Sequence, residues 1–95
     1  MGLTVGVCTL TLWLPECQSL KDKRRVLQRL IDRVRNRFNV AVAEVGGQNT
    51  WQTAVLGIAC VSNSRRHADE ILARLADFVR ECGELEVTGC EVELL

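Results

Sequence analysis

The spacing of the hydrophobic residues along this chain changes four times between a period of two and a period of about 3.6, and this alternation constrains the fold more than any other feature. Residues 3–14 alternate in steps of two, and both of the resulting faces are largely apolar. Beyond Pro15, apolar residues repeat at helical spacing from Leu20 to Arg37, and Ser19 stands where a helix cap belongs. The first part of the chain therefore predicts a strand and then an amphipathic helix.

The same order returns after a predicted hairpin. Residues 40–45 and 51–61 are typical of two strands, and the turn between them contains Gly46 and Gly47. Polar residues at positions 62–64 are cap candidates for a second amphipathic helix that follows the hairpin. The middle of the chain therefore predicts two antiparallel strands and a second helix.

The last predicted strand, residues 85–95, follows Gly83 and contains Gly89, which marks a bulge or an edge position. The complete order is strand, helix, strand, strand, helix, strand. Right-handed crossovers and hairpin pairing then favour a four-stranded antiparallel sheet in the order 4-1-3-2, with two helices on one face. We therefore expect one α+β domain over residues 1–95, with the ferredoxin-like split βαβ (βαββαβ) fold.

The first strand is central in this order and apolar on both sides, so one sheet face is left uncovered and hydrophobic. A second copy of the chain would cover that face, and we expect a homodimer through the sheet face. The alternative is that the threonines, glycines and alanines of these strands make the face tolerable in a monomer.

The composition excludes several classes of protein. Twelve basic and twelve acidic residues give a net charge of zero, so any attraction to nucleic acid must be local. No run approaches the ~20 apolar residues that span a bilayer, and the N-terminus lacks a basic leader, so we expect a cytoplasmic protein without a membrane partner.

The cysteines and the lone histidine indicate neither a metal site nor a disulfide framework. The five cysteines are odd in number and form no Cys-x-x-Cys pair, so we expect them to be reduced and mostly buried, with no metal and no cofactor. A catalytic thiol would have only His67 as a partner, and no other catalytic constellation stands at recognisable spacing, so no catalytic residue is predicted.

Basic residues crowd the predicted start of the first helix, where the helix dipole already places partial positive charge. An anion such as a backbone phosphate would offset this cost, which makes the cluster a candidate nucleic-acid or anion site. The alternative is that these side chains are merely solvated beside acidic neighbours. The cluster consists of Lys21, Lys23, Arg24 and Arg25.

A second basic zone follows if the two helices run antiparallel. The end of the first helix, with Arg33, Arg35 and Arg37, would then lie near the start of the second. Arginines at a helix end also complement the dipole without any ligand. The residues that would extend the footprint on the second helix are Arg65, Arg66 and His67.

The hairpin tip is polar and is expected close to the start of the first helix, so it forms a possible ligand edge. Trp51 could stack on a base there, although packing within the protein is the favoured interpretation. Glu44 is the carboxylate on which an undetected enzyme would depend. The candidate edge consists of Glu44, Gln48, Asn49, Trp51 and Gln52.

Several short motifs along the chain point to a known family. They are residues 19–25, 36–40, 43–45, 54–57 and 61–63 with Gln48, Trp51 and Gln52. These motifs resemble the YlxP-like family of small bacterial proteins, and the resemblance covers nearly the whole chain. It implies a ferredoxin-like fold and carries over no catalytic residue. Family members are often encoded beside genes for translation and ribosome maturation factors, which implies RNA or the ribosome as a partner by association. Gly46 and Gly47 depart from the acidic residue that is usual in the family after the matching valine.

The leading hypothesis is therefore a non-enzymatic, RNA- or ribosome-associated accessory protein that binds phosphates at its first helix. The rival is a protein-interaction or small-ligand module that acts through its apolar sheet face. An enzyme built on the hairpin edge is the third alternative.

Overall fold

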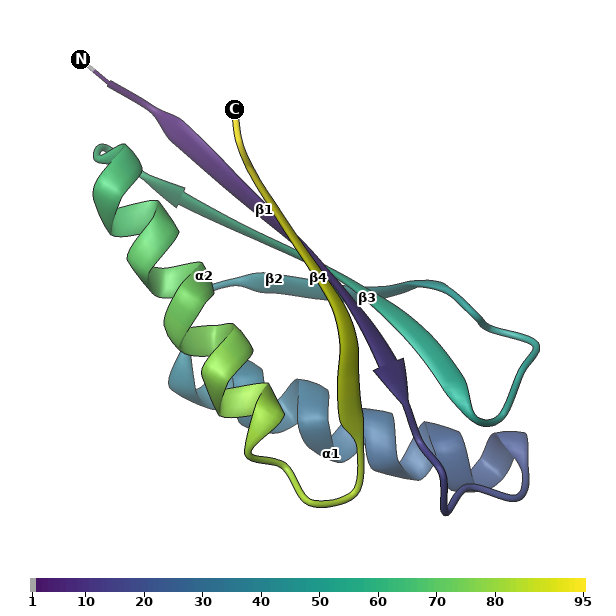
Figure 1. Cartoon of the computed structure of the whole chain (residues 1–95). Coiled ribbons are helices and arrows are strands. Elements are labelled where there is room, and N and C mark those ends of the chain that lie inside the picture. The colour runs from purple at the N-terminus through teal and green to yellow at the C-terminus, as the bar shows by residue number, and fades with distance from the viewer. Residues whose placement is uncertain (1) are drawn as a thin grey trace.

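The computed structural model describes residues 2–95 and contains four strands and two helices in the predicted order (Figure 1). The strands form one antiparallel sheet in the order β2-β3-β1-β4, which is the predicted order read from the other edge. The predicted α+β fold is confirmed. The elements are β1 (Thr4–Trp13), α1 (Leu20–Arg37), β2 (Ala41–Gly46), β3 (Thr53–Ser62), α2 (Arg65–Arg80) and β4 (Glu86–Leu94).

Both helices begin at a serine cap. The Ser19 hydroxyl accepts a hydrogen bond from the Asp22 backbone N–H at 3.0 Å, and Ser64 accepts one from the His67 N–H at 3.2 Å. These bonds satisfy amides that the helix itself leaves without acceptors. Helix α1 ends at Phe38, whose backbone turns to an extended conformation.

The two faces of the sheet separate by residue parity. Even-numbered residues from Thr4 to Leu12 and from Ala54 to Cys60 are buried beneath the helices, as at the Leu10 and Leu56 pair. The apolar side chains among them form the core with apolar residues of α1 and α2. Odd-numbered residues point to the other side, which neither α1 nor α2 covers. We call this side the open face.

Strand β4 contains the irregularity predicted at Gly89. Thr11 pairs with Gly89 but Leu12 pairs with Val87, so Thr88 is an extra residue in β4. The Thr88 hydroxyl donates a hydrogen bond to the Thr11 carbonyl at 3.3 Å. A Cβ atom at Gly89 would lie 3.3 Å from the Thr11 side chain, so the close approach of the two strands favours glycine.

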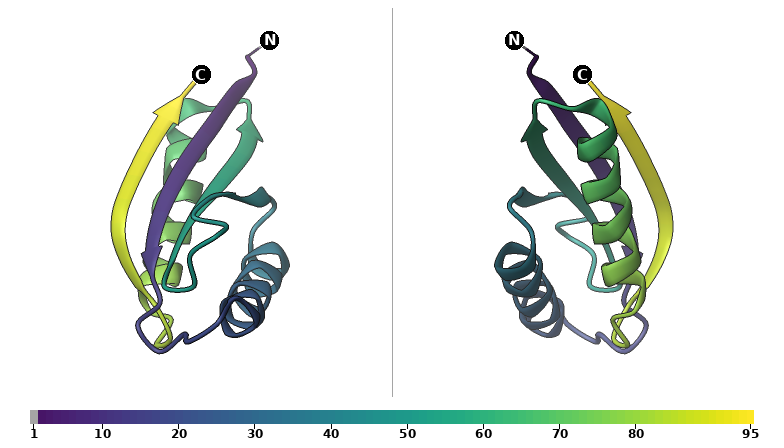
Figure 2. Two further views of the ribbon diagram at one scale, coloured as in Figure 1. Left: turned by 90° about the vertical axis from the view of Figure 1, so that its right-hand side faces the viewer. Right: turned by 90° about the vertical axis from the view of Figure 1, so that its left-hand side faces the viewer.

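The two helices cross at a wide angle instead of lying antiparallel along each other: in Figure 2 α2 stands upright, whereas α1 is seen nearly end-on. Helix α2 packs on β1, β3 and β4, whereas α1 meets the sheet at the β2 edge. The end of α1 contacts the second half of α2, where the Phe38 and Phe78 rings meet edge-on with centroids 5.8 Å apart. Because Arg65 precedes Phe78 by thirteen residues, it lies about 20 Å away along the helix axis.

Candidate nucleic-acid interface

Charge is segregated between the elements of this protein. All twelve lysines and arginines lie on the two helices, eight on α1 and four on α2. Helix α1 contains only two acidic residues and so has a net charge of plus six, whereas α2 has a net charge of plus one. Outside the helices every ionisable side chain except the cysteines is acidic: Glu16, Glu44, Glu81, Glu84, Glu86, Glu91 and Glu93.

The start of α1 presents three cations to solvent. Lys21, Arg24 and Arg25 are exposed, and none of them makes an ion pair within 4.0 Å to any residue in the range 2–95. The neighbouring Asp22 carboxylate is occupied, because it accepts the Gln18 backbone N–H at 3.1 Å. These three side chains therefore form an unneutralised cluster at the positive end of the helix dipole. We call it the α1 basic cluster.

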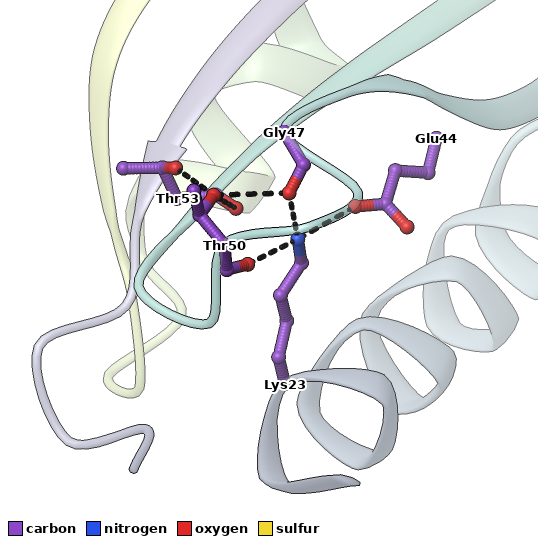
Figure 3. Close-up of polar contacts among 5 residues, drawn as sticks. All are labelled: Lys23, Glu44, Gly47, Thr50 and Thr53. Carbon is purple, nitrogen blue, oxygen red and sulfur yellow. Dashed lines mark hydrogen bonds and ion pairs between the residues drawn. The ribbon is translucent and has the colours of Figure 1, made fainter. Parts of the chain in front are cut away.

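Lys23, the fourth predicted member of this cluster, is placed differently (Figure 3). Its side chain is only 2% exposed, and its ammonium donates hydrogen bonds to the carbonyl oxygens of Gly47 and, at 2.7 Å, Thr50. The prediction that Lys23 contacts a phosphate is therefore wrong. The helical period turns position 23 toward the hairpin tip, where the two carbonyls and Glu44 take up its donors.

Glu44 supplies the charge that balances Lys23. The Glu44 Oε2 atom lies 2.9 Å from the Lys23 Nζ atom, an ion-pair contact. That oxygen is buried but accepts no hydrogen bond of good geometry within residues 2–95. The attraction between Glu44 and Lys23 is therefore electrostatic and does not depend on a directed hydrogen bond. An ion-paired carboxylate at the foot of the hairpin is a structural partner, and this geometry gives no support to an enzyme that depends on it.

The hairpin tip, residues 47–52, is fastened at several points. Gly47 has a positive φ of 74°, which favours glycine, and its carbonyl accepts both the Lys23 ammonium and the Thr50 hydroxyl. At the other end of the tip, the Gln52 carbonyl accepts the Leu14 N–H at 2.8 Å. The Gln52 side-chain amide donates to the carbonyls of residues 15 and 17 at 3.3 and 3.2 Å. The predicted proximity of this tip to the start of α1 is confirmed.

Trp51 stands on this tip with its side chain 51% exposed. The favoured prediction that Trp51 is packed within the protein is therefore wrong, because the contacts that fix the tip are made by its neighbours. Residues 49–53 line an open hollow of about 370 Å³ beside it. Gln48 and Asn49 are exposed, and their side-chain amides make no hydrogen bond to any part of the chain that the structure describes.

The second predicted basic zone does not assemble. Arg33 and Arg37 both stack on the Phe78 ring, with guanidinium carbons 5.2 and 5.1 Å from its centroid, and therefore lie far from Arg65. The expectation that the end of α1 adjoins the start of α2 is thus wrong, because the helices cross and the end of α1 meets the second half of α2. Arg35 instead donates to the Val42 carbonyl at 3.0 Å.

The residues at the start of α2 form a separate and smaller group. Arg65 is exposed, whereas Arg66 pairs with Glu70 at 3.1 Å on the same helix. The His67 Nδ1 atom lies 3.2 Å from the Ser62 hydroxyl, so the imidazole is held at the end of β3. The structure therefore keeps this group apart from the α1 basic cluster.

Arg29 was not among the predicted site residues. It pairs with Glu84 at 2.6 Å across the groove between α1 and the loop before β4. The sequence contained a pattern that could have identified Arg29, because cations recur every four residues as one row along one side of the helix. The row consists of Lys21, Arg25, Arg29, Arg33 and Arg37. Its later members are engaged with other side chains, which leaves the first two free for a ligand.

The thiols of this protein are unpaired, and most of them are buried. All five cysteines are free, and three of them are buried, in agreement with the prediction. Burial, reinforced by the neighbouring Cys90, raises the pKa of the Cys8 thiol to about 12, and burial likewise raises the pKa of Cys17. Within residues 2–95 no three acidic, histidine or cysteine side chains gather as metal ligands would, and neither helix is long and apolar enough to cross a membrane.

Comparison with known proteins places the chain in a family. The family model described as "Protein of unknown function (DUF503)" matches residues 5–92. The chain belongs to the DUF503 family. Among its relatives is the "Uncharacterized protein YlxP" of Bacillus subtilis (strain 168), to which it is 47% identical over 75 residues, 79% of this chain and 82% of that protein. The resemblance to YlxP-like proteins is thereby confirmed.

The fold of this DUF503 member is also found among solved structures. The de novo designed protein Foldit4 is 16% identical and superposes with a TM-score of 0.52 over 97% of this chain and 93% of its own. At this identity the likeness concerns the fold alone.

Proposed function

We propose that this protein is a non-enzymatic, cytoplasmic RNA-binding accessory factor, which associates with RNA or the ribosome through the α1 basic cluster. The observation that carries the proposal is the segregation of charge. A chain of zero net charge places plus six on one helix and leaves three exposed cations at its start without partners among residues 2–95.

Nucleic acid is the polyanion that such a surface fits. Each phosphate neutralised by a lysine or arginine releases counterions, so three free cations add substantially to affinity at low salt. The amides of the first turn and the helix dipole add to the attraction at the same point. Arg65, Arg66 and His67 extend the footprint only for an RNA long enough to reach the start of α2.

Sedimentation with ribosomal subunits and with bare ribosomal RNA, at low and moderate salt, tests this proposal. The test variant changes Lys21, Arg24 and Arg25 to alanine and leaves the buried Lys23 intact. The matched control removes the same charge at three exposed arginines outside the proposed footprint, by changing Arg29, Arg74 and Arg80 to alanine. We expect the α1 variant to lose most binding and to reduce the salt slope by about two, since each single-strand phosphate contact contributes about 0.7.

Two results would refute the proposal. Absence of association in every condition would exclude RNA and the ribosome as partners. Equal weakening in both triple variants would mean that binding follows net charge, and that the start of α1 is not the site.

A second candidate function is supported by the open face of the sheet. Its exposed apolar side chains include Val61 at 66% and Trp13 at 43%. Among residues 2–95, the acids on this face are Glu86, Glu91 and Glu93, which follow the β4 rim. The uncharged centre suits a second copy of this chain in a two-fold dimer, as the sequence predicted. In such a dimer both basic helices would stay on the outside, so dimerisation and RNA binding are compatible.

Analytical ultracentrifugation over a hundredfold range of concentration tests the dimer. We expect a concentration-dependent dimer that Val61→Asp converts to a monomer, whereas Val61→Thr leaves it intact. Because Val61 is exposed, neither change should alter the fold. A wild-type protein that is monomeric throughout this range would contradict the dimer.

A further inference from the structure

We infer that Trp51 and the hairpin tip form a stacking site for an unpaired RNA base, which makes single-stranded RNA the ligand of the α1 basic cluster. This inference rests on the proposed function and specifies its substrate. Three observations support it: Trp51 is half-exposed, the backbone on both sides of it is held by hydrogen bonds, and the hairpin tip lies against α1.

The backbone on both sides of Trp51 is fixed, although its side chain is free. The Thr50 carbonyl accepts a hydrogen bond from the Lys23 ammonium. The Thr50 hydroxyl lies 2.5 Å from the Thr53 hydroxyl, with which it shares a hydrogen bond. Gln52 is held through its carbonyl and its side-chain amide. An aromatic ring presented on such a loop loses little conformational freedom when a ligand stacks on it. The loop is therefore preorganised for binding.

The surroundings of Trp51 match a nucleobase. The hollow of about 370 Å³ beside it is large enough for a planar ring system, and it is lined by polar residues as well as the indole. The free side-chain amides of Gln48 and Asn49 supply donors and acceptors of the kind that pair with base edges. A base that stacks here must leave its own helix, because paired RNA keeps its bases within the stack.

The tip is joined directly to the helix that carries the cations. Lys23 reaches from the first turn of α1 to the residue before Trp51, and it stands between Lys21 and Arg24 in the sequence. One strand can therefore place a phosphate on the α1 basic cluster and a neighbouring base on Trp51. The buried ion pair of Lys23 and Glu44 fixes the two halves of this surface relative to each other.

Fluorescence titration tests the inference, because the chain has only two tryptophans. Trp13→Phe leaves Trp51 as the sole emitter, and Trp51→Phe leaves Trp13 on the open face as the matched control. Each is titrated with oligouridine and with duplex RNA of equal phosphate number at one salt concentration. In the Trp13→Phe variant we expect oligouridine to quench the emission of Trp51 with saturation. Trp13 lies opposite Thr53, which lines the hollow, so in the Trp51→Phe variant we expect a smaller quench of Trp13 emission.

Affinity gives a second measurement. We expect Trp51→Ala to weaken oligouridine binding about 5-fold to 150-fold, the range for loss of one stacked base, and to leave duplex binding unchanged. Unchanged emission and affinity, with binding still lost in the α1 triple variant, would overturn the inference and leave the proposed function intact. If neither RNA binds the wild-type protein, both the inference and the proposed function are wrong.

Discussion

The contact between Lys23 and the hairpin tip leads to a quantitative prediction about stability. Replacing Lys23 with methionine keeps most of the aliphatic stem but removes the ammonium, which leaves the Glu44 carboxylate and the Thr50 carbonyl without their partner, whereas the Gly47 carbonyl still accepts from Thr50. Breaking a buried ion pair by removal of one member costs about 3–5 kcal/mol. Because Glu44 remains 24% exposed and water can reach part of it, we expect the lower end, about 3 kcal/mol.

Urea unfolding followed by far-UV circular dichroism measures this cost, with Lys21→Met as the matched control. Lys21 is exposed and unpaired among the described residues, so its substitution should stay within about 0.5 kcal/mol of wild type. Glu44→Gln should cost less than Lys23→Met, because the ammonium keeps its two carbonyls. If Lys23→Met unfolds at the same urea concentration as Lys21→Met, the ion pair does not anchor the tip.

Three further predictions concern single residues. Gly47→Ala should destabilise the fold by about 1–2 kcal/mol, since φ is positive and a Cβ would lie 3.0 Å from the Thr53 carbonyl oxygen. Gly83 has open space around it, so Gly83→Ala should leave the free energy of unfolding unchanged in the same urea assay. Because the pKa of Cys8 is raised to about 12 in the folded protein, the unfolded chain loses that proton first. The free energy of unfolding should therefore fall above about pH 8.5, by up to about 1.4 kcal/mol per pH unit, and a pH series with Cys8→Ala should show a shallower fall. Ser19→Ala should cost about 1 kcal/mol by loss of the α1 cap, and an unchanged urea midpoint would contradict the role of that bond.

The sequence was sufficient for the architecture because the elements are encoded locally. Period-two and helical spacing, the two serine caps and the irregularity at Gly89 all depend on neighbouring residues, and each prediction was confirmed. The crossing of the helices was not predictable in this way. It depends on how α1 and α2 pack on different parts of the sheet, and this placed Phe78 against Arg33 and Arg37.

The candidate site was predicted in outline but not residue by residue. Four cations in the first turns of one helix necessarily point in different directions. The prediction grouped them as one cluster because they are close in the sequence. The structure turns Lys23 inward onto a loop more than twenty residues away, a long-range contact that no local pattern signals. The exposure of Trp51 was predicted wrongly for a related reason. The contacts that hold its loop are made by the neighbouring residues and not by the indole.

The separation of charge between the helices and the rim of the sheet makes this neutral molecule an electric dipole. The positive end is α1, which lies by the β2 edge, and the negative end is the row of Glu86, Glu91 and Glu93 on β4 at the opposite edge. Within about a Debye length of 8–10 Å of a polyanion, the electric field rotates the protein before the two molecules make contact. Helix α1 then faces the polyanion and β4 faces away from it. Orientation on approach, and not overall attraction, is what this charge distribution provides.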